Sequence, residues 1–571
     1  MNTAPRPRAI YSTWGLHDEL GDTVHLTETL ATAAFEELLR WRDRFGIRTD
    51  VFHIDCMWFD PARGLDHFHP AHWPNGFEPL RRRILAEGMK PGLWYSANGS
   101  WLKPAAWSDS WSSNHWHHSL FEGSFAAQFE ASLLRAARDW GVRFFKFDFA
   151  QFESATAACG LATEVRYQRG FARFVAMLEK LRSEFPDVEM ITHCGFARGR
   201  LDQARPLETT VLPPAVDPSL LGVVDRVFSA DPHVFDVPCS DITRAVDLHQ
   251  DRQVWHLHRA GFPLHRIDDH GAVMATTNTG HYRGRAGFLR THLGQLARGG
   301  RRDLFYGDPS VLTEADLATM ARTRRLFFDA WERGLETCFV GLGEPGRHPW
   351  HGWLTGGGHR GLLHLVNWTD HPVRVRLPIV SVLEARALFH DCAAAPAVQV
   401  QHDLLTVELP PECTTLIGVG AYADASWGEA VATNDPASLR SARLLDCTWR
   451  HEPDGLQAAV RGLQPGERLR VTVEVDEAGP GQVAQGSFRV ARQTTKAAGD
   501  TMEPDSHKLV RISARQHGRD LALVRRVPEV PIFCGISWLI SEFEVTGDAE
   551  VSILPQLDPA RKLTATLHAV R

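Results

Sequence analysis

Strand-like and helix-like segments alternate about eight times over the first 335 or so residues. Each short apolar run suits a buried parallel strand, and a longer stretch with helical periodicity follows it. The expected strands are 9–14, 50–55, 90–96, 143–150, 188–193, 224–231, 263–269 and 303–306. The expected helices are 25–44, with Thr27 as N-cap, 77–87, 124–140, 167–185, 241–258, 288–298 and 313–331. This order predicts an α/β fold, a (β/α)8 TIM barrel. A doubly wound sheet is the competing fold, but the sequence lacks its glycine-rich turn after the first strand.

The pattern changes near residue 335, where short alternating strands replace the helical periodicity. Such strands are expected at 361–368, 373–377, 404–409, 469–475, 508–512 and 542–545. Small residues fill 421–437, which we interpret as a linker. The sequence therefore predicts a barrel over 1–335, a β-sandwich over 336–421 and a second, accessory β-sandwich over 438–571.

The composition of the 571 residues excludes several classes of function. A net charge of −7 argues against nucleic-acid binding, and no apolar run is long enough to span a membrane. The start of the chain shows no signal-peptide pattern, and the nine cysteines are scattered without metal-binding spacing. We therefore expect reduced thiols in a cytoplasmic protein. His115, His117 and His118 lack an acid or cysteine partner at usable spacing, so no metal and no cofactor are expected. The oligomeric state, including a homo-oligomer, is left open.

The strand at 143–150 has a side-chain pattern that a plain core strand does not have. Alternation puts Phe145, Phe147 and Phe149 on one face, which suits packing under helices. The other face carries Lys146 and Asp148, and buried charges are costly unless they are paired or used. One interpretation is a structural ion pair. The other, which we favour, is a catalytic carboxylate at the carboxyl end of a barrel strand.

Further acids and aromatic residues follow the ends of other expected strands. Asp55 ends the second strand and Asp231 the sixth, where barrel sites are built. Trp58 and Trp94 are evenly balanced between core packing and a platform for a sugar ring. The chain has 18 Trp against 6 Tyr, and four of the tryptophans lie in the long loop 98–121. A loop of this length after a strand indicates substrate binding.

Three stretches resemble a known family. They are 54–59 with 73–76 and 88–94, then Lys146-Phe-Asp148, and then Cys194 through Arg200 to Asp202. They are similar in order and spacing to glycoside hydrolase family 36 and its clan relatives, the retaining α-galactosidases. The resemblance covers residues 9 to 335 or so and extends to Asn367-Trp368 in the first β-sandwich.

The resemblance implies a retaining α-glycosidase, α-galactosidase-like, that acts on a small carbohydrate. Asp148 would be the nucleophile, and Lys146 would favour its ionised form. The acid/base would be Asp231, with Asp241 as its rival, although Asp241 could equally be the N-terminal acid of a helix. The substrate-binding residues would be Asp55, Trp58, Trp94, Lys146, Cys194, Arg198, Arg200 and Asp202.

One departure from the family bears on the sugar. Many members have two adjacent acids after the second strand, whereas this chain has Asp55 followed by Cys56. A preference for galactose is therefore not expected. The alternatives are an α-glucoside- or modified-sugar-specific hydrolase, a transglycosidase, or a non-catalytic carbohydrate-binding protein on a barrel scaffold.

Overall fold

The computed structural model of the chain describes residues 6–17, 25–113, 116–193, 196, 217–229, 237–274, 287–392, 395–432, 442–453, 455–475, 510–529, 538–555 and 563–570. None of the helices in these ranges is long and apolar enough to cross a membrane.

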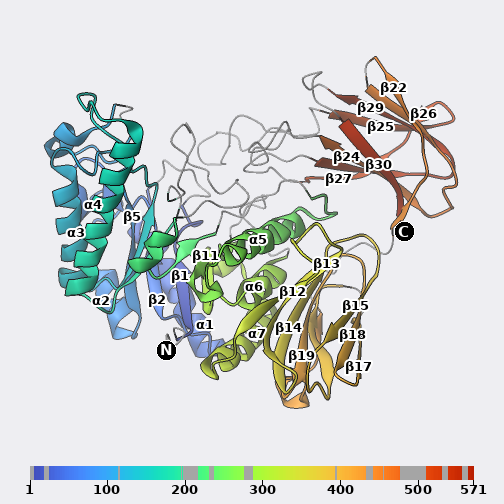
Figure 1. Ribbon diagram of the computed structural model, residues 1–571, viewed down its shortest axis with the longest axis horizontal. Helices are drawn as coiled ribbons and strands as arrows, with labels where there is room; N and C mark the ends of the chain where they lie inside the picture. The colour runs from blue at the N-terminus through green and yellow to red at the C-terminus, as the bar shows by residue number, and fades with distance from the viewer. Residues whose placement is uncertain are drawn as a thin grey trace.

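A seven-stranded parallel sheet forms the centre of the N-terminal part, as the alternating pattern predicts (Figure 1). In sheet order its strands are β10 (Ala272–Met274), β11 (Arg302–Gly307), β1 (Arg8–Ser12), β2 (Val51–Ile54), β5 (Lys90–Ser96), β6 (Phe144–Asp148) and β7 (Glu189–Thr192). A parallel bridge joins Ile191 to Arg226 beside the short β8 (Val227–Phe228), and β8 pairs with β9 (Ile267–Asp268), which precedes β10. The sheet is TIM-barrel-like.

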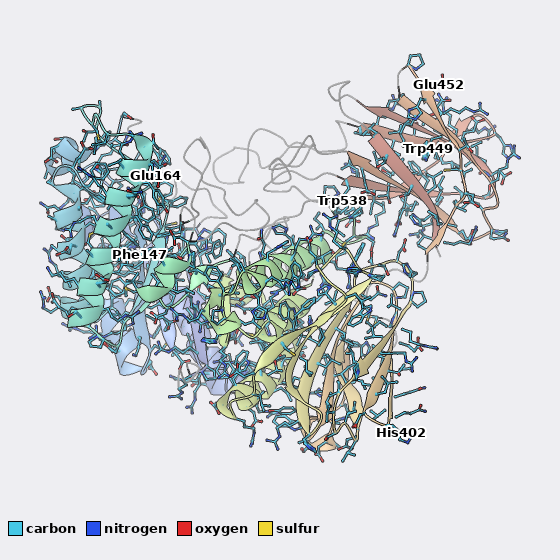
Figure 2. The ribbon with its side chains drawn as sticks, viewed as in Figure 1. Phe147, Glu164, His402, Trp449, Glu452 and Trp538 are labelled. Carbon is cyan, nitrogen blue, oxygen red and sulfur yellow. The ribbon has the colours of Figure 1, made fainter. Side chains whose placement is uncertain are left out.

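Seven α-helices accompany these strands in the described ranges. They are α1 (Glu28–Phe45), α2 (Glu78–Ala86), α3 (Phe125–Asp139), α4 (Thr163–Glu184), α5 (Ile242–Arg259), α6 (Phe288–Ala297) and α7 (Glu314–Glu332). Thr27 is the N-cap of α1, as predicted, and its hydroxyl accepts from the backbone N–H of Leu30 at 3.2 Å. Phe147 of β6 packs edge-on against Phe174 of α4, on the helix-covered side of the sheet (Figure 2).

Local details of the barrel differ from the sequence prediction. The loop after β2 contains a small hairpin, β3 (Phe59–Asp60) with β4 (Gly64–Phe68), which the sequence analysis missed. The strand expected at 263–269 begins instead with a 3-10 turn, η5 (Leu264–Arg266), because Pro263 with its fixed φ of −62° caps that turn. Strand pairing starts only at β9.

Two sheets follow the barrel, antiparallel except for the pairing of β16 with β20. The first has the order β12 (Thr337–Gly341), β13 (Trp350–Gly357), β14 (Arg360–Asn367), β19 (Cys413–Gly420), β16 (Ala385–His390) and β20 (Val431–Ala432). The second is β15 (Val373–Pro378), β18 (Leu404–Leu409) and β17 (Ala397–Gln401). Leu363, Val375 and Leu405 belong to one core cluster, so the two sheets form a sandwich.

The predicted linker at 421–437 is only partly a linker, which corrects the sequence interpretation. Tyr422 is fully buried, and its hydroxyl donates to Asp329 of α7 at 2.7 Å. β20 pairs in parallel with β16, so residues up to Ala432 belong to the first sandwich. Residues 433–437 lie outside the described ranges. The described part of this segment is therefore packed against α7 and the first sandwich.

The last described residues form two five-stranded antiparallel sheets. One is β21 (Ala442–Leu444), β30 (Leu563–Val570), β24 (Arg468–Val475), β28 (Trp538–Glu544) and β27 (Leu523–Val527). The other is β22 (Trp449–Glu452), β23 (Gly455–Val460), β29 (Ala549–Pro555), β25 (Val510–Gln516) and β26 (Arg519–Asp520). Trp538 is fully buried here, and the same apolar cluster reaches Ile242 and Val246 of α5 (Figure 2).

Candidate active site

Asp148 is the last residue of β6, at the carboxyl end of the parallel sheet. Its side chain is 5% exposed and accepts from the indole N–H of Trp94 at 3.1 Å. The next residue, Phe149, has a φ of 52°, and its backbone N–H donates to the other carboxylate oxygen at 2.8 Å. A left-handed φ on an aromatic residue is strained and is found mostly at functional sites. The strand therefore ends on a carboxylate held by two donors.

This turn also corrects one prediction about the strand faces. Phe145 and Phe147 share a face, as alternation requires, and their rings stack. Phe149 does not join them, because its positive φ redirects the chain at the end of β6. Its ring instead packs edge-on against Trp94 and Trp101, beside the carboxylate.

His193, directly after β7, contacts the carboxylate of Asp148. Its Nδ1 lies 3.4 Å from the carboxylate Oδ2, and its backbone N–H donates to the carbonyl of Phe147 at 2.7 Å. Burial raises the pKa of Asp148, but the contact with His193 and the charge of Lys146 outweigh burial and hold that pKa below its usual value. The carboxylate is therefore ionised at neutral pH, as a nucleophile must be.

Lys146 forms a buried ion pair with Asp55 rather than with Asp148. Its Nζ lies 3.0 Å from Oδ2 of Asp55, and both side chains are at most 3% exposed. Ser12 donates to the same oxygen at 3.0 Å, and the N–H of Cys56 donates to the other at 2.8 Å. Burial raises the pKa of Asp55, whereas the charge of Lys146 lowers it. The net result is a pKa held well below its usual range.

Aromatic rings surround the ammonium group of Lys146. Its Nζ lies 5.8 Å from the ring centre of Trp14 and 5.5 Å from that of Tyr306. His270, which follows β9, packs against both of these rings and lies 6.0 Å from the ring of His193. Residues in β6 and β11, and residues just after β1, β7 and β9, thus meet at one end of the sheet.

The two tryptophans that the sequence left undecided are both fully buried. Trp58 donates its indole N–H to the carbonyl of Trp94 at 3.1 Å and packs against Phe68 and Trp140, the surroundings of a core residue. Trp94 combines packing with its hydrogen bond to Asp148.

The tryptophan-rich loop encloses a cavity of about 290 Å³. Its walls include His25, Met57, Trp101, Lys103, Trp111, Trp116 and His117. Trp116 is 48% exposed, whereas Trp107 in the same loop is 6% exposed and packs on Phe125. Trp101 touches Phe149, so this cavity adjoins the turn that carries Asp148. A mostly apolar, tryptophan-lined cavity suits the flat face of a sugar.

Asp241 is the N-cap of α5 and accepts from the backbone N–H of Thr243 at 2.8 Å. Its carboxylate also lies 3.3 Å from the guanidinium of Arg290. Burial raises its pKa, but Arg290 and then Arg244 lower it more, to about 2. Cys194, Arg198, Arg200, Asp202 and Asp231 lie outside the described residues.

Neither His193 nor His270 was assigned to the site from the sequence. Each stands directly after a parallel strand or one residue beyond it, and this position is the signal that could have found both. The ion pair of Lys146 with Asp55 was also missed, because it joins β6 to the residue after β2, 91 positions apart.

The sequence matches no protein-family model and no curated protein. Among solved structures, the fold is similar to the GH36 α-galactosidase AgaA from Geobacillus stearothermophilus, with a TM-score of 0.50 and 14% identity over 73% of this chain and 56% of that chain. It is also similar to the galactosidase domain of the α-galactosidase-sucrose kinase AgaSK, with a TM-score of 0.50 and 13% identity over 72% of this chain and 54% of that chain. An AgaA variant in complex with 1-deoxygalactonojirimycin is similar at a TM-score of 0.50 and 14% identity, over 72% of this chain and 56% of that chain. The chain therefore spans just over half the length of these structures, and it has the fold of GH36 α-galactosidases.

Proposed function

We propose that this protein is a retaining α-glycosidase, α-galactosidase-like in fold, with Asp148 as its nucleophile. The observation that carries the proposal is the state of Asp148: a carboxylate at the mouth of a barrel-like sheet, fixed by Trp94 and held ionised by its neighbours.

The chemistry is a double displacement. Asp148 attacks the anomeric carbon and forms a covalent glycosyl ester, while a second carboxylic acid protonates the leaving oxygen. That second group, now ionised, then takes a proton from water, whose oxygen displaces Asp148. Trp94 keeps the attacking oxygen oriented, and the paired Lys146 and Asp55 would hold sugar hydroxyls.

Asp231 is the acid/base in this proposal, and Asp241 is its rival. The acid must be protonated before it acts, so its pKa has to be raised. Asp241 has the opposite tendency, with a pKa of about 2 beside Arg290, and its oxygens already cap α5. Asp231 follows β8 by a few residues, near the carboxyl end of the sixth parallel strand.

The substrate in this proposal is a neutral α-glycoside for which galactose is not the preferred sugar. An axial hydroxyl bound by Asp55 alone would lack one charge-assisted hydrogen bond, worth about 1.5–3 kcal/mol, or roughly tenfold or more in selectivity. At the position where many members of the family have a second acid, Cys56 offers only a thiol, which lies 3.4 Å from His17 Nε2. A panel of aryl α-glycosides should therefore show no clear preference for the galactoside.

Turnover of that panel by Asp148→Ala is the decisive test. The variant should lose activity by a factor of about 10³ or more, and azide should restore part of it with inverted product. Asp231→Ala should slow substrates with poor leaving groups most, because these need protonation. If the wild-type protein binds sugars and turns over none of the panel, the protein is a carbohydrate-binding module on a barrel scaffold and the proposal is wrong.

A further inference from the structure

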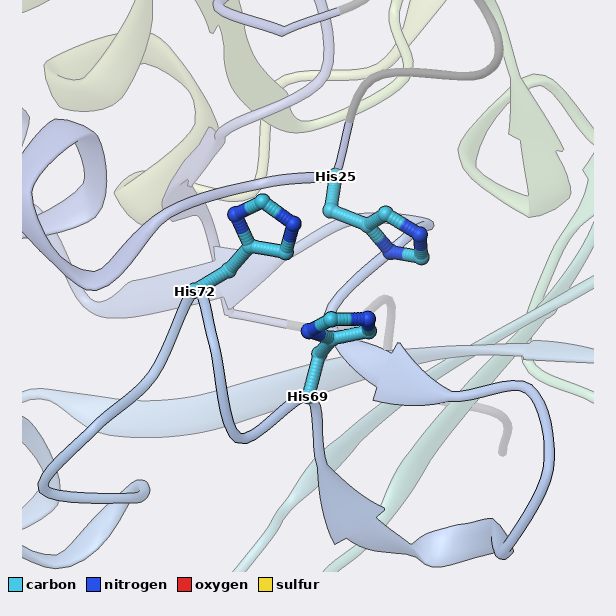
Figure 3. A group of neighbouring side chains, drawn as sticks. All are labelled: His25, His69 and His72. Atoms are coloured by element: carbon cyan, nitrogen blue, oxygen red, sulfur yellow. The ribbon is translucent and has the colours of Figure 1, made fainter.

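Three histidines form a cluster outside the proposed catalytic residues. His25 precedes α1, whereas His69 and His72 lie in the loop between β4 and α2 (Figure 3). One ring nitrogen from each lies within 4.8 Å of those of the other two, and all three side chains are half-buried. The loop is tight, because the carbonyl of His69 accepts from the backbone N–H groups of His72 and Trp73. Two segments far apart in sequence thus bring three imidazoles together.

The hydrogen bonds leave ring nitrogens free to act as ligands. Nδ1 of His25 lies 3.2 Å from the carbonyl oxygen of Met57, so this nitrogen carries the proton and donates, and Nε2 is left with its lone pair. A backbone carbonyl that fixes the far nitrogen in this way is the usual support of a metal-binding histidine. Nδ1 of His69 is buried and has no hydrogen-bond partner, which a bound ion would supply.

A second group of potential metal ligands, around Asp391, is less suited to bind a cation. Asp391 and the thiols of Cys392 and Cys413 are buried together, but Arg244 and Arg290 lie 2.7 and 3.4 Å from the carboxylate. Two guanidinium groups already neutralise that acid and would repel a cation. The histidine cluster is the better candidate of the two.

We propose that His25, His69 and His72 bind one divalent ion of the zinc class. Tetrahedral zinc holds imidazole nitrogens at 2.0–2.1 Å, so its ligand atoms are about 3.4 Å apart, and small rotations of the rings reach that spacing. Three protein ligands leave a fourth position for water or another small ligand. His25 also lines the cavity of the tryptophan-rich loop, so the ion would lie beside that cavity and would join the start of α1 to its wall.

Zinc titration of chelator-treated protein tests the proposal, and it does not depend on glycosidase activity. The wild-type protein should bind one zinc per chain, and its zinc K-edge absorption should show three nitrogens and one oxygen at 2.0–2.1 Å. His69→Gln and His72→Gln should each weaken binding by about 100-fold or more, because each removes a ligand. His67→Gln is the matched control, since this histidine lies in the same segment and outside the cluster, and it should bind zinc like the wild type.

The thermal midpoint gives a second measurement. Zinc should raise it in the wild-type protein and in His67→Gln, and should leave it unchanged in His69→Gln. Circular dichroism of the metal-free variants shows whether they fold. The zinc K-edge spectrum is measured on the wild-type protein, so this test does not depend on the folding of any variant. Absence of zinc binding by the wild-type protein, sulfur in its coordination shell, or equal binding by His69→Gln and His67→Gln would each overturn the proposal.

Discussion

The ionisation of Asp148 depends most strongly on one neighbouring ring. His193 contributes the largest of the effects that lower its pKa, against the effect of burial. Because that pKa is depressed, the ionised carboxylate is present at neutral pH and is lost only as the pH falls through the lowered value.

His193→Ala should therefore move the acidic limb of the kcat/KM profile to higher pH. Burial still raises the pKa of Asp148 in this variant, and the largest effect that lowers this pKa is removed with His193. The pKa of Asp148 therefore rises. A profile of kcat/KM over about pH 3 to 8 measures this pKa in the free enzyme. His402→Ala, on an exposed residue of the first β-sandwich, should leave the profile unchanged. An unmoved limb in His193→Ala would mean that a different group sets the ionisation.

At the scale of elements, α4 approaches the turn after β6 unusually closely. A Cβ placed on Gly170 would lie 2.0 Å from the carbonyl oxygen of Phe152, which is a backbone atom that cannot easily move. This contact requires glycine in the middle of a helix, where alanine is normally favoured by about 1 kcal/mol.

Gly170→Ala should consequently destabilise the protein despite the better helix propensity of alanine. We expect a loss of about 1–3 kcal/mol, as for other overpacked sites, and a lower thermal midpoint. Gly160→Ala is the control, because no atom lies within 4 Å of its added methyl group. A stabilised Gly170→Ala would show that α4 can shift away from the turn at little cost.

The tryptophans of loop 98–121 should divide into two kinds. Trp116 is exposed at the cavity, so Trp116→Ala should raise KM several-fold and leave the thermal midpoint nearly unchanged. Trp107 is buried against Phe125, so Trp107→Ala should cost about 3–5 kcal/mol of stability. Steady-state kinetics and thermal unfolding of both variants separate the two effects. Equal effects of both variants on KM would contradict this division.

Periodicity predicted the elements well and the residues beyond their ends poorly. The strand 143–150 and the helix after Thr27 follow local rules of alternation and capping, which the sequence displays directly. The reversal at Phe149 and the pairing of Lys146 with Asp55 depend on contacts between distant strands, which no local pattern encodes. The position of Asp148 at the end of its strand could therefore be predicted, but its contact with His193 of the neighbouring strand could not.

At the scale of the whole molecule, a buried polar centre joins the barrel to the first β-sandwich. Asp251 of α5 accepts hydrogen bonds from Arg298 of α6 at 2.9 Å and from Trp353 of β13 at 3.0 Å, and His351 lies 3.0 Å from its other oxygen. Burial raises the pKa of Asp251, whereas Arg298 and, to a smaller extent, His351 lower it. The net result is a pKa held well below its usual value.

Asp251→Ala should weaken this junction, because it leaves Arg298 buried without its closest partner. The expected cost is about 3–5 kcal/mol, measured as a lower midpoint in differential scanning calorimetry. The folded pKa is depressed, so this stabilisation is complete above the unfolded pKa near 4 and disappears as the pH falls through the lower folded value. The difference between wild type and variant should shrink accordingly in acid. Asp187→Ala, at a surface ion pair, should cost less than about 1 kcal/mol at any pH.

The pairing of Lys146 with Asp55 also has a consequence for which sugars the barrel mouth would admit. Because Lys146 is paired with Asp55, its charge offsets the ionised carboxylate of Asp148 only in part, and a negative field remains around that carboxylate. Such a field attracts the positive charge that grows on a sugar ring as its glycosidic bond breaks. It repels a sugar that carries its own carboxylate: at about 5 Å and an effective dielectric constant of about 20, that repulsion is about 3 kcal/mol. The same residue that would drive the reaction would thereby disfavour uronic acids by charge alone.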